Sequence, residues 1–236
     1  MGLSVYSLTK IKNILDLLPK NPKILFLSYP DLLVTPKQLN QIFKKKFIGL
    51  KYRSDSDEIL NWHKGYKYIL NGIFRTEDVF NQLNCECTFY DLGPYRQAEE
   101  IKNLNDEWHE YKKFDLVIDN VLQHCFNVGQ ALLNIHHSLD VNSYVMHLHP
   151  YLWPNQGFHC FSTEFYWSWY DLGYEVIDFE VHDKNKCYKL KQWEKAPEVG
   201  KKSKIIFIAK KKEPSRHIHW PIQRKFQVHA SSKIYK

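Results

Sequence analysis

The chain has 236 residues, of which 44% are hydrophobic and 15% are aromatic, so it can bury a substantial core and is too apolar to be a disordered chain. No apolar run approaches the roughly 20 residues that a membrane-spanning helix needs, and residues 1–20 lack the features of a secretory signal. The formal net charge is +7, but acidic and basic residues balance in 1–209, and the excess lies in 210–236. A nucleic-acid-binding domain spreads its positive charge over a folded face. Nucleic acid is therefore not an expected partner, and neither is a membrane.

Five cysteines occur at irregular spacing. An odd number without a paired pattern is typical of free thiols in a reducing compartment, and we therefore expect a cytoplasmic protein. Cys85 and Cys87 fall on one face of a predicted strand. No second cysteine pair would complete a metal site there, so buried thiols are the prediction.

The first half of the chain alternates apolar strands with short helices. Residues 1–20 have apolar side chains at helical spacing. Residues 23–30 form an apolar run bounded by prolines, which is typical of a buried strand. Helices are then predicted at 36–47, where a proline occupies the first turn, and at 54–68 and 76–83, which begin with capping residues.

The second half contains the stronger strand signals. Strands are predicted at 85–93, 100–105, 114–120, 144–149, 174–181 and 203–210, and helices at 126–139 and 162–172. The alternation predicts an α/β fold, a three-layer sandwich with a mostly parallel, Rossmann-like seven-stranded sheet. Only 183–202 separates the last two strands, without a convincing helix, so a hairpin and an antiparallel last strand are expected. We expect one domain at 1–209 and a basic C-terminal extension at 210–236.

The strands end in residues that could form a ligand site. Ligands of open α/β sheets bind beyond the carboxyl ends of the strands. The residues in that position are Ser28, Tyr29, Asp91, Asn103, Asp119, Asn120 and His149. Most of them are polar although the strands that they follow are apolar. We therefore expect this rim of the sheet to line a ligand cleft.

Residues 114–181 resemble part of the class I S-adenosylmethionine-dependent methyltransferases. That family commonly has FD and two apolar residues in its fourth strand, and LEH shortly after it; here FDLVIDNVLQH ends in Leu122, Gln123 and His124. The later NQGFHCFS at 155–162 resembles an NHGFYxFS loop of a bacterial subgroup, some members of which are linked to sugar or surface-polysaccharide modification. The resemblance implies a methyltransferase-like domain with S-adenosylmethionine as its cofactor.

The glycine-rich turn of the family is missing. In the family GxGxG usually follows the first strand, because the cofactor approaches the bare backbone there. In this chain SYPDLL follows the first predicted strand, and no glycine occurs between Gly2 and Gly49. The bacterial subgroup also tends to lack these glycines. A non-catalytic binding module that keeps the fold is therefore an open alternative.

The resemblance assigns cofactor contacts to residues that follow the strands. The predicted cofactor-binding residues are Ser28, Tyr29, Asp91, Asn103, Leu104, Asp119 and Asn120. An acid at the position of Asp91 accepts hydrogen bonds from both ribose hydroxyls; the alternative is an aspartate that only forms a turn. Asn103 falls near the adenine amino group of the cofactor, and Asp119 near its methionine end.

Three histidines are candidate catalytic residues, namely His124, His149 and His159. Methyl transfer to oxygen or nitrogen is an in-line displacement in which the protein chiefly positions the reactants, and a hydroxyl acceptor gains from a general base such as histidine. His124 could instead cap the helix that follows it. His147 and His149 share one strand face and could bind a metal together with His159. No metal-binding spacing supports this, so no metal is predicted.

Trp153, Asn155 and Gly157 are the predicted substrate-binding residues. They fall in a loop on the cleft side, and a loop with aromatic and amide side chains can bind a sugar or a nucleotide. The sequence thus predicts an S-adenosylmethionine-dependent methyltransferase acting on an oxygen or nitrogen of a small polar metabolite. An anionic or saccharide acceptor, with a role in polysaccharide or capsule biosynthesis, is the finer expectation. A binding module on the same fold and a metal-dependent hydrolase are the alternatives, and the oligomeric state is not predicted.

The basic extension mixes cations with apolar residues in RHIHWPIQRKF, 216–226. A solvated tail does not need Trp220, Ile222 or Phe226, so we expect this segment to dock on the domain. A role in attracting an anionic acceptor is a further hypothesis, and a solvated tail is the alternative.

Overall fold

The computed structural model describes residues 2–214 except 67, 70, 96–98, 154, 171–172, 184–185 and 195. The chain forms two compact units, Met1–Asn103 and Leu104–Lys236, which are described separately. The single domain expected at 1–209 stays a prediction. The segment 216–226, for which docking is expected, lies outside the described residues, as does everything after residue 214. In the described part of the chain, no helix is both long and apolar enough to cross a membrane.

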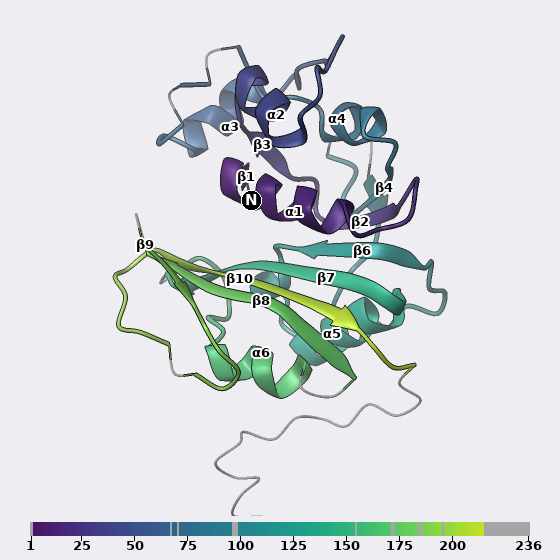
Figure 1. Ribbon diagram of the computed structural model, residues 1–236, viewed down its shortest axis with the longest axis vertical. Coiled ribbons are helices and arrows are strands. Elements are labelled where there is room, and N and C mark those ends of the chain that lie inside the picture. Colours follow the sequence, from purple (N-terminus) through teal and green to yellow (C-terminus); the bar gives the residue numbers. More distant parts are fainter. Residues whose placement is uncertain are drawn as a thin grey trace, which may run out of the picture. The chain divides into compact units, whose positions relative to one another are not determined.

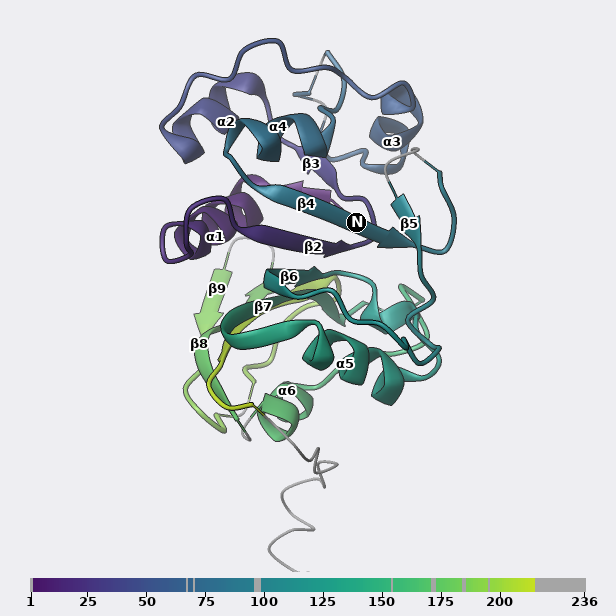
Figure 2. The same ribbon diagram turned by 90° about the vertical axis from the view of Figure 1, so that its right-hand side faces the viewer.

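The first unit is built on three parallel strands in the order β5-β4-β2 (Figure 2). They are β2 (Lys23–Leu27), β4 (Glu86–Asp91) and β5 (Glu99–Ile101). β2 is buried from its second residue onward, as its unbroken apolar sequence predicts. A separate pair of short strands, β1 (Gly2–Ser4) and β3 (Asp31–Leu33), is also parallel.

Helices occupy the segments of the first unit where they were predicted. They are α1 (Val5–Leu15), α2 (Pro36–Phe43), α3 (Ser56–Trp62) and α4 (Thr76–Gln82). α1 buries the apolar face formed by Leu8, Ile11 and Ile14. α2 begins with a reciprocal capping box between Thr35 and Gln38, which satisfies backbone N–H groups of its first turn.

The second unit contains five strands in the order β6-β7-β10-β8-β9 (Figure 1). They are β6 (Phe114–Asp119), β7 (Leu139–Leu152), β8 (Tyr174–Asp183), β9 (Lys186–Lys189) and β10 (Ser203–Lys211). β6 and β7 are parallel, whereas β10 is antiparallel to both β7 and β8. The predicted α/β class with Rossmann-like parallel pairing and an antiparallel last strand is therefore confirmed.

Strands β7 and β9 of the second unit differ from the prediction. β9 forms an antiparallel ribbon with β8 inside a segment expected to be only a connection, because a four-residue strand, KCYK, gives no clear sequence signal. Together with β1 and β3, which were also not predicted, it raises the number of strands in the described residues from the predicted seven to ten. β7 does not end at Pro150 but continues to Leu152. Pro150 pairs with Lys204 beside a register shift in β10, an irregularity that accommodates a residue without an N–H group.

Helices α5 (Val128–His137) and α6 (Thr163–Tyr170) cover one face of this five-stranded sheet (Figures 1 and 2). Tyr166 and Trp167 of α6 pack on Phe207 and Phe179 of the sheet, and the ring centroids lie 5.0 Å apart in each pair. Large aromatic rings supply most of the buried apolar area in such contacts. The aromatic-rich stretch that forms α6 is therefore mainly core.

All five cysteines are free, as predicted. Cys85 is buried and Cys87 is half-buried. Burial raises the pKa of the Cys85 thiol to about 11, so this thiol is protonated and unreactive at neutral pH. The reading of the Cys85–Cys87 pair as core thiols fits these positions.

A lysine side chain binds carbonyl oxygens at the C-terminal end of α5. Lys210 and Lys211, which the sequence places in the basic extension, are the last residues of β10. The buried Lys211 ammonium donates to the carbonyl oxygens of His136 and Leu139, both at 2.9 Å. Burial lowers the pKa of Lys211 to about 8. The cation thus binds the carbonyl of His136 in the last turn of α5 and that of Leu139, the first residue of β7.

His136 lies beside this lysine and is 5% exposed. Its Nδ1 atom is 2.7 Å from the Tyr174 hydroxyl. Burial, together with the charge of Lys211, lowers the pKa of His136 to about 3. The imidazole is therefore neutral in the folded protein at any pH well above 3.

We expect His136 to make the fold acid-sensitive. Below the ordinary histidine pKa of about 6.5 the unfolded chain binds a proton that the folded chain excludes, so the free energy of unfolding falls as the pH falls. Between pH 7.5 and pH 5 this amounts to about 2 kcal/mol. His136→Asn keeps an acceptor for the Tyr174 hydroxyl and removes the titration, so it should show a smaller decline in urea unfolding. His109→Asn, at an exposed position, is the control; equal declines in both variants would contradict the prediction.

Candidate functional site

The turn after β2 takes the place of the missing glycine-rich turn. Ser28 has φ +85°, in the left-handed region that favours glycine. Its N–H donates to the carbonyl oxygen of Tyr90 in the adjacent β4, at 2.7 Å. The backbone after β2 therefore adopts a glycine-like conformation although the residue is serine.

Asp91, the predicted ribose ligand, is the last residue of β4 and is half-buried. Its Oδ1 atom accepts a hydrogen bond from the N–H of Leu92 at 2.8 Å. This contact is typical of an aspartate that stabilises a turn. It engages one carboxylate oxygen, and both readings of Asp91 given by the sequence are compatible with its position.

Tyr29 forms a wall of a cavity of about 450 Å³ in the first unit. Its buried hydroxyl donates to the Glu77 carboxylate and accepts from the N–H of Thr76 at 2.8 Å. Burial and the Glu77 charge raise the pKa of Tyr29 far above 10. The hydroxyl is therefore held by the protein, and what Tyr29 offers a ligand is its ring.

Two arginines in this cavity were not predicted by sequence reasoning. The Arg53 guanidinium lies 5.0 Å from the Tyr29 ring and donates to Asp31 at 2.7 Å and to Asp55 at 2.6 and 2.9 Å. Arg75 pairs with Glu77. The two arginines that line the cavity are thus paired with carboxylates. Its residues are Tyr29, Tyr52, Arg53, Ser54, Asp55, Arg75, Glu77 and Tyr95.

Asn103 and Leu104 lie after β5, which ends at Ile101, whereas the predicted strand at 100–105 contains both residues. Asn103 is half-buried, and Leu104 is buried. The carbonyl oxygen of Leu104 accepts from the side-chain amide of Asn134 at 3.1 Å, and that amide also donates to the carbonyl of Asp106 at 2.8 Å. Asn134 of α5 is fully buried and fixes this segment. A polar residue inside an apolar helix face was the signal that could have revealed it.

A buried polar network follows β6. Asp119 Oδ2 accepts from His147 Nδ1 at 2.6 Å and lies 2.8 Å from His149 Nε2. The second contact has ion-pair distance but not the alignment of a hydrogen bond. Asp119 Oδ1 accepts from the N–H groups of Val121 and Leu122 at 2.9 and 3.1 Å. Asp119, His147 and His149 are at most 1% exposed.

Two tyrosines of α6 complete this network. The Tyr170 hydroxyl contacts His147 Nε2, and the Tyr166 hydroxyl lies 2.5 Å from His149 Nδ1. Burial, followed by the charge of Asp119, raises the Tyr166 pKa well above 10, so this hydroxyl is protonated and donates. Burial alone would raise the pKa of Asp119, but the two imidazoles hold it below its usual range. The carboxylate is therefore charged and is enclosed by donors.

His149 therefore does not lie open at a strand end, as the sequence suggested. β7 continues past it, and the imidazole faces Asp119 and Tyr166. The alternative metal set of His147, His149 and His159 also changes. Among the described residues, the group with metal-ligand geometry that contains His147 and His149 is completed by Asp119 and not by His159. Its members contact tyrosine hydroxyls and backbone N–H groups, and His149 Nε2 has no hydrogen-bond partner among the described residues.

The predicted loop residues pack against the short helix η1 (Leu122–His124) that follows β6. The N–H of His159 donates to the Gln123 carbonyl at 3.2 Å. Gly157 approaches the same carbonyl so closely that an added Cβ would lie 2.6 Å from its oxygen. The structure therefore brings Gly157 and His159 next to His124, which is exposed at the end of η1.

The region where this loop meets η1 contains buried polar atoms without hydrogen-bond partners among the described residues. They are Oε1 of Gln123 and Nε2 of His159. Gln123 is 1% exposed, and its Nε2 donates to the Asn120 carbonyl at 2.9 Å. Unsatisfied buried groups are uncommon and often mark a functional site. Sequence reasoning missed Gln123, although it occupies the position of the acid in the family's LEH.

The remaining predicted substrate residues lie at the start of the same loop. Trp153 is half-buried, and the Lys204 ammonium lies 5.6 Å from its ring centroid. Asn155 is exposed with a left-handed φ of +65°. Two further aromatics, Phe126 at 81% and Phe158 at 71% exposure, meet edge to face with centroids 6.1 Å apart. Exposed aromatics next to a polar rim are typical of a ligand-binding surface.

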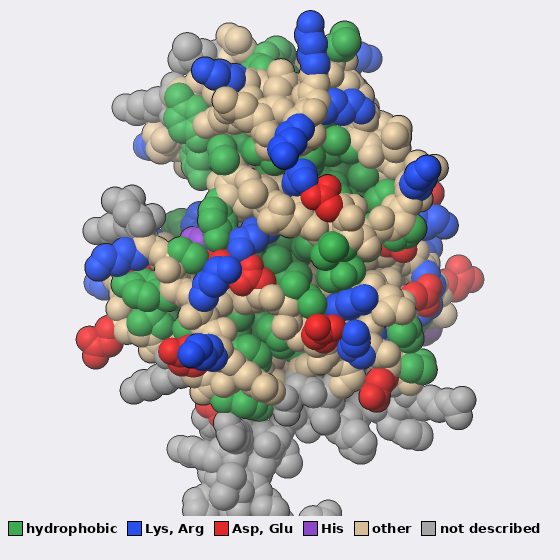
Figure 3. Space-filling model, viewed as in Figure 1, with side chains coloured by type: hydrophobic (Ala, Val, Ile, Leu, Met, Phe, Trp, Pro, Cys, Tyr) green, Lys and Arg blue, Asp and Glu red, His purple; other side chains and the backbone are tan. Residues whose placement is uncertain are grey.

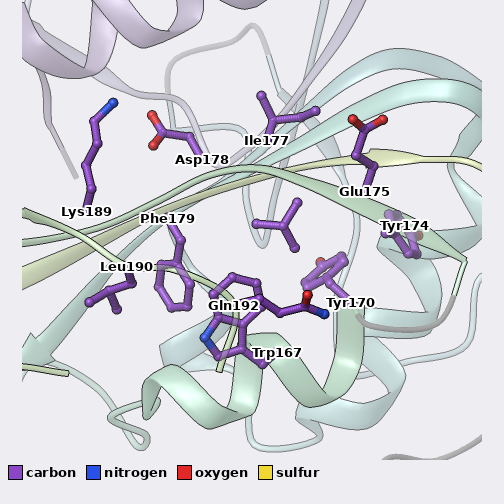
Figure 4. Close-up of a pocket in the computed structure, with 11 residues that line it drawn as sticks. Trp167, Tyr170, Tyr174, Glu175, Ile177, Asp178, Phe179, Lys189, Leu190 and Gln192 are labelled. Carbon is purple, nitrogen blue, oxygen red and sulfur yellow. The ribbon is translucent and has the colours of Figure 1, made fainter. Parts of the chain in front are cut away.

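A separate cavity of about 520 Å³ lies between α6, β8 and the segment after β9 (Figure 4). Trp167, Tyr170 and Phe179 point toward it, and Gln192 lies opposite them. The indole N–H of Trp167 is buried without a hydrogen-bond partner among the described residues. None of the residues predicted from the sequence lines this cavity.

Comparisons with known proteins find methyltransferases by structure alone. No protein-family model matches the chain, and no curated protein matches it by sequence. TehB from Haemophilus influenzae is 13% identical over 86% of this chain, with a TM-score of 0.43. The chain spans 62% of the TehB chain.

Two further solved structures match most of both chains. A complex of the Haloferax volcanii Trm112 methyltransferase activator and a methyltransferase is 11% identical, covers 89% of this chain and 91% of the other, and has a TM-score of 0.42. The antibiotic-resistance methyltransferase Kmr is 9% identical, covers 91% and 96%, and has a TM-score of 0.39. All these TM-scores are below 0.5, so the fold description rests on the strands of this chain.

The order of elements in the second unit follows the pattern of the class I methyltransferases that the sequence resembles. β6, α5, β7, α6 and β8 succeed one another as fourth strand, helix, fifth strand, helix and sixth strand. β10 then returns antiparallel between β7 and β8. This arrangement is the α/β, Rossmann-like pattern with an antiparallel end.

We expect Gly157→Ala to disturb the loop. The new methyl group would press on the Gln123 carbonyl, and such overpacking costs about 1–3 kcal/mol. Urea unfolding should show this loss. The control is Gly65→Ala, because a Cβ at Gly65 meets no atom within 4 Å. If the two variants were equally stable, the close approach would be contradicted.

We expect Asp119→Ala to be strongly destabilising. Its removal leaves His147, His149 and two backbone N–H groups without their buried acceptor, a change that typically costs about 3–5 kcal/mol. Asp140→Ala, whose side chain is 64% exposed, should change the free energy of unfolding by less than about 0.5 kcal/mol. Similar unfolding midpoints for the two variants would rule out the structural role assigned to Asp119.

Proposed function

We propose that the chain is an S-adenosylmethionine-dependent methyltransferase acting on an oxygen or nitrogen of a small polar metabolite. Its main support is the set of polar residues that follow the parallel strands within each unit. Ser28 follows β2 and Asp91 ends β4, whereas Asp119 ends β6 and Asn120 follows it. These are the positions that the family resemblance assigns to the cofactor, and the carboxyl ends of parallel strands are where such folds bind ligands.

The turn at Ser28 removes part of the difficulty raised by the missing glycines. Glycine is favoured in such a turn partly because it adopts the left-handed conformation readily, and Ser28 has that conformation. Asp91 would accept the ribose hydroxyls with its carboxylate, whose Oδ1 atom also accepts from the N–H of Leu92. Asn103 and Leu104 would contact the adenine ring, as in the family.

Asp119 contributes in a different way. Its carboxylate is enclosed by the two histidines and by the backbone N–H groups after β6. It therefore shapes the turn that leads through Asn120 to η1, and Asn120 would offer the contact to the methionine end of the cofactor. Asp119 acts as a positioning residue.

His124 is the best-placed general base of the three predicted histidines. It is exposed at the end of η1, whereas His149 is buried in the core network. Partial burial lowers the pKa of His124, so the imidazole is neutral at neutral pH and can accept a proton from an acceptor hydroxyl. His159 would assist through its partnerless Nε2 atom.

The loop with Trp153, Asn155 and Gly157 would hold the acceptor. Its aromatic and amide groups, beside Lys204, suit a polar ring compound, including a saccharide or an anion. A role in polysaccharide or capsule biosynthesis follows from the resemblance of this loop. The free cysteines fit a reducing compartment, and we propose a cytoplasmic location. On the face that Figure 3 shows, Lys and Arg side chains are interspersed with acidic ones, and nucleic acid is not a proposed partner.

Cofactor binding is the first test. We expect S-adenosylhomocysteine to bind the full chain in titration calorimetry, and Asp91→Ala to weaken this binding by about 1.5–3 kcal/mol because a charge-assisted hydrogen bond is lost. Asp57→Ala, at an exposed position of α3 in the same unit, is the matched control.

The outcomes separate the candidate functions. Absence of binding to the wild-type chain would overturn the methyltransferase proposal and favour the non-catalytic module. Binding that Asp91→Ala leaves unchanged would remove only Asp91 from the site. Release of S-adenosylhomocysteine from S-adenosylmethionine in the presence of candidate acceptors would then identify the acceptor.

A further inference from the structure

The ribbon formed by β8 and β9 places three metal-binding residue types on one face. Glu180 and His182 are two residues apart on β8, so their side chains point to the same side of the strand. Cys187 of β9 is the cross-strand partner of His182. The register of the ribbon, and not a single rotamer, therefore brings a carboxylate, an imidazole and a thiol together.

The three ligand atoms converge on one point. His182 Nε2 lies 2.9 Å from Glu180 Oε2 and 3.6 Å from Cys187 Sγ, and all three atoms lie within 4.8 Å of one another. Tetrahedral zinc bonds of about 2.0–2.1 Å to nitrogen or oxygen and about 2.3 Å to sulfur give separations of about 3.3 Å for N to O and about 3.6 Å for N to S. The two separations that involve His182 Nε2 lie within a few tenths of an ångström of these values.

The same convergence excludes a catalytic relay. In a nucleophile–histidine–carboxylate relay the nucleophile and the carboxylate contact opposite ring nitrogens. Here both Cys187 and Glu180 contact Nε2 of His182. A metal site, in contrast, requires each ligand to direct one atom toward a common centre.

Charge and exposure support a transition-metal ion. Glu180 is fully buried, and the Lys189 ammonium lies 3.9 Å from it, beyond hydrogen-bonding distance. A thiolate and a carboxylate together neutralise a divalent ion. The Cys187 side chain is exposed, and that of His182 is 22% exposed, so an ion can enter from solvent. A thiolate ligand favours zinc over magnesium, calcium or manganese.

We propose that Glu180, His182 and Cys187 bind a zinc ion, with a water molecule in the fourth position. Three protein ligands with an open position are typical of accessible zinc sites. The ion would cross-link β9 to β8 and so fix the edge of the sheet. This site is separate from the residues assigned to methyl transfer and does not depend on that assignment.

The experiment uses the full chain, stripped with a chelator and kept reduced, and titrates it with Co²⁺ as a spectroscopic probe of zinc sites. We expect one Co²⁺ per chain, a near-ultraviolet thiolate-to-cobalt band, and displacement of the band by Zn²⁺. Cys187→Ser should abolish the thiolate band, and Glu180→Gln should weaken Co²⁺ binding at least tenfold. Cys160→Ser, which changes the other exposed cysteine, should leave both unchanged.

Several results would overturn the proposal. They are the absence of a thiolate band in the wild-type chain, a band that persists in Cys187→Ser, and a band lost in Cys160→Ser. If Cys187→Ser still binds the ion and His147→Gln does not, the ion occupies the buried network after β6. Circular dichroism of each variant excludes unfolding as the cause of lost binding. Thermal unfolding should also show that Zn²⁺ raises the melting temperature of the wild-type chain and not that of Cys187→Ser.

Discussion

A carboxylate buried away from water must be compensated by nearby donors or cations, and Asp119 imposes this requirement on the second unit. Its side chain ties the end of β6 to the two histidines of β7, and those histidines in turn meet Tyr166 and Tyr170 of α6. The tyrosines are four residues apart and so lie on one helix face. One buried charge thus sets the mutual register of two strands and a helix, and the turn that leads to His124.

Part of this network could be predicted from sequence. The H-x-H pattern places His147 and His149 on one face, and the polar end of an apolar strand marks Asp119. Their association depends on the pairing of Asp119 with His147 across β6 and β7, which no local pattern encodes. Pro150 suggested a strand end, so His149 was assigned to an open cleft. The irregularity in β10 that lets β7 continue, and so buries His149, is a tertiary effect.

The residues around η1 in the candidate site also show that local sequence patterns do not reveal tertiary contacts. Sequence reasoning selected Gly157, His159 and His124, and the structure brings them together around Gln123. It did not select Gln123 itself, because a glutamine in a short turn carries no periodic signal. Likewise the sequence showed only that the glycine-rich turn is missing, yet Ser28 has a φ of +85° and so a glycine-like backbone conformation. Backbone conformation there follows from the hydrogen bond to Tyr90, which joins strands distant in sequence.

Among the described residues, three buried carboxylates are compensated in different ways. Asp31 pairs with Arg53 at 2.7 Å and with His63 at 3.1 Å, and Asp119 is enclosed by imidazoles and backbone amides. Glu180 faces His182 at 2.9 Å, with a thiol at 3.6 Å from the same nitrogen and an ammonium 3.9 Å from its other oxygen. The first two carboxylates are surrounded by hydrogen-bond donors of the protein. The third site combines a buried carboxylate with an imidazole and a thiol that reach solvent, and a metal ion bound there would add a further cation beside Glu180.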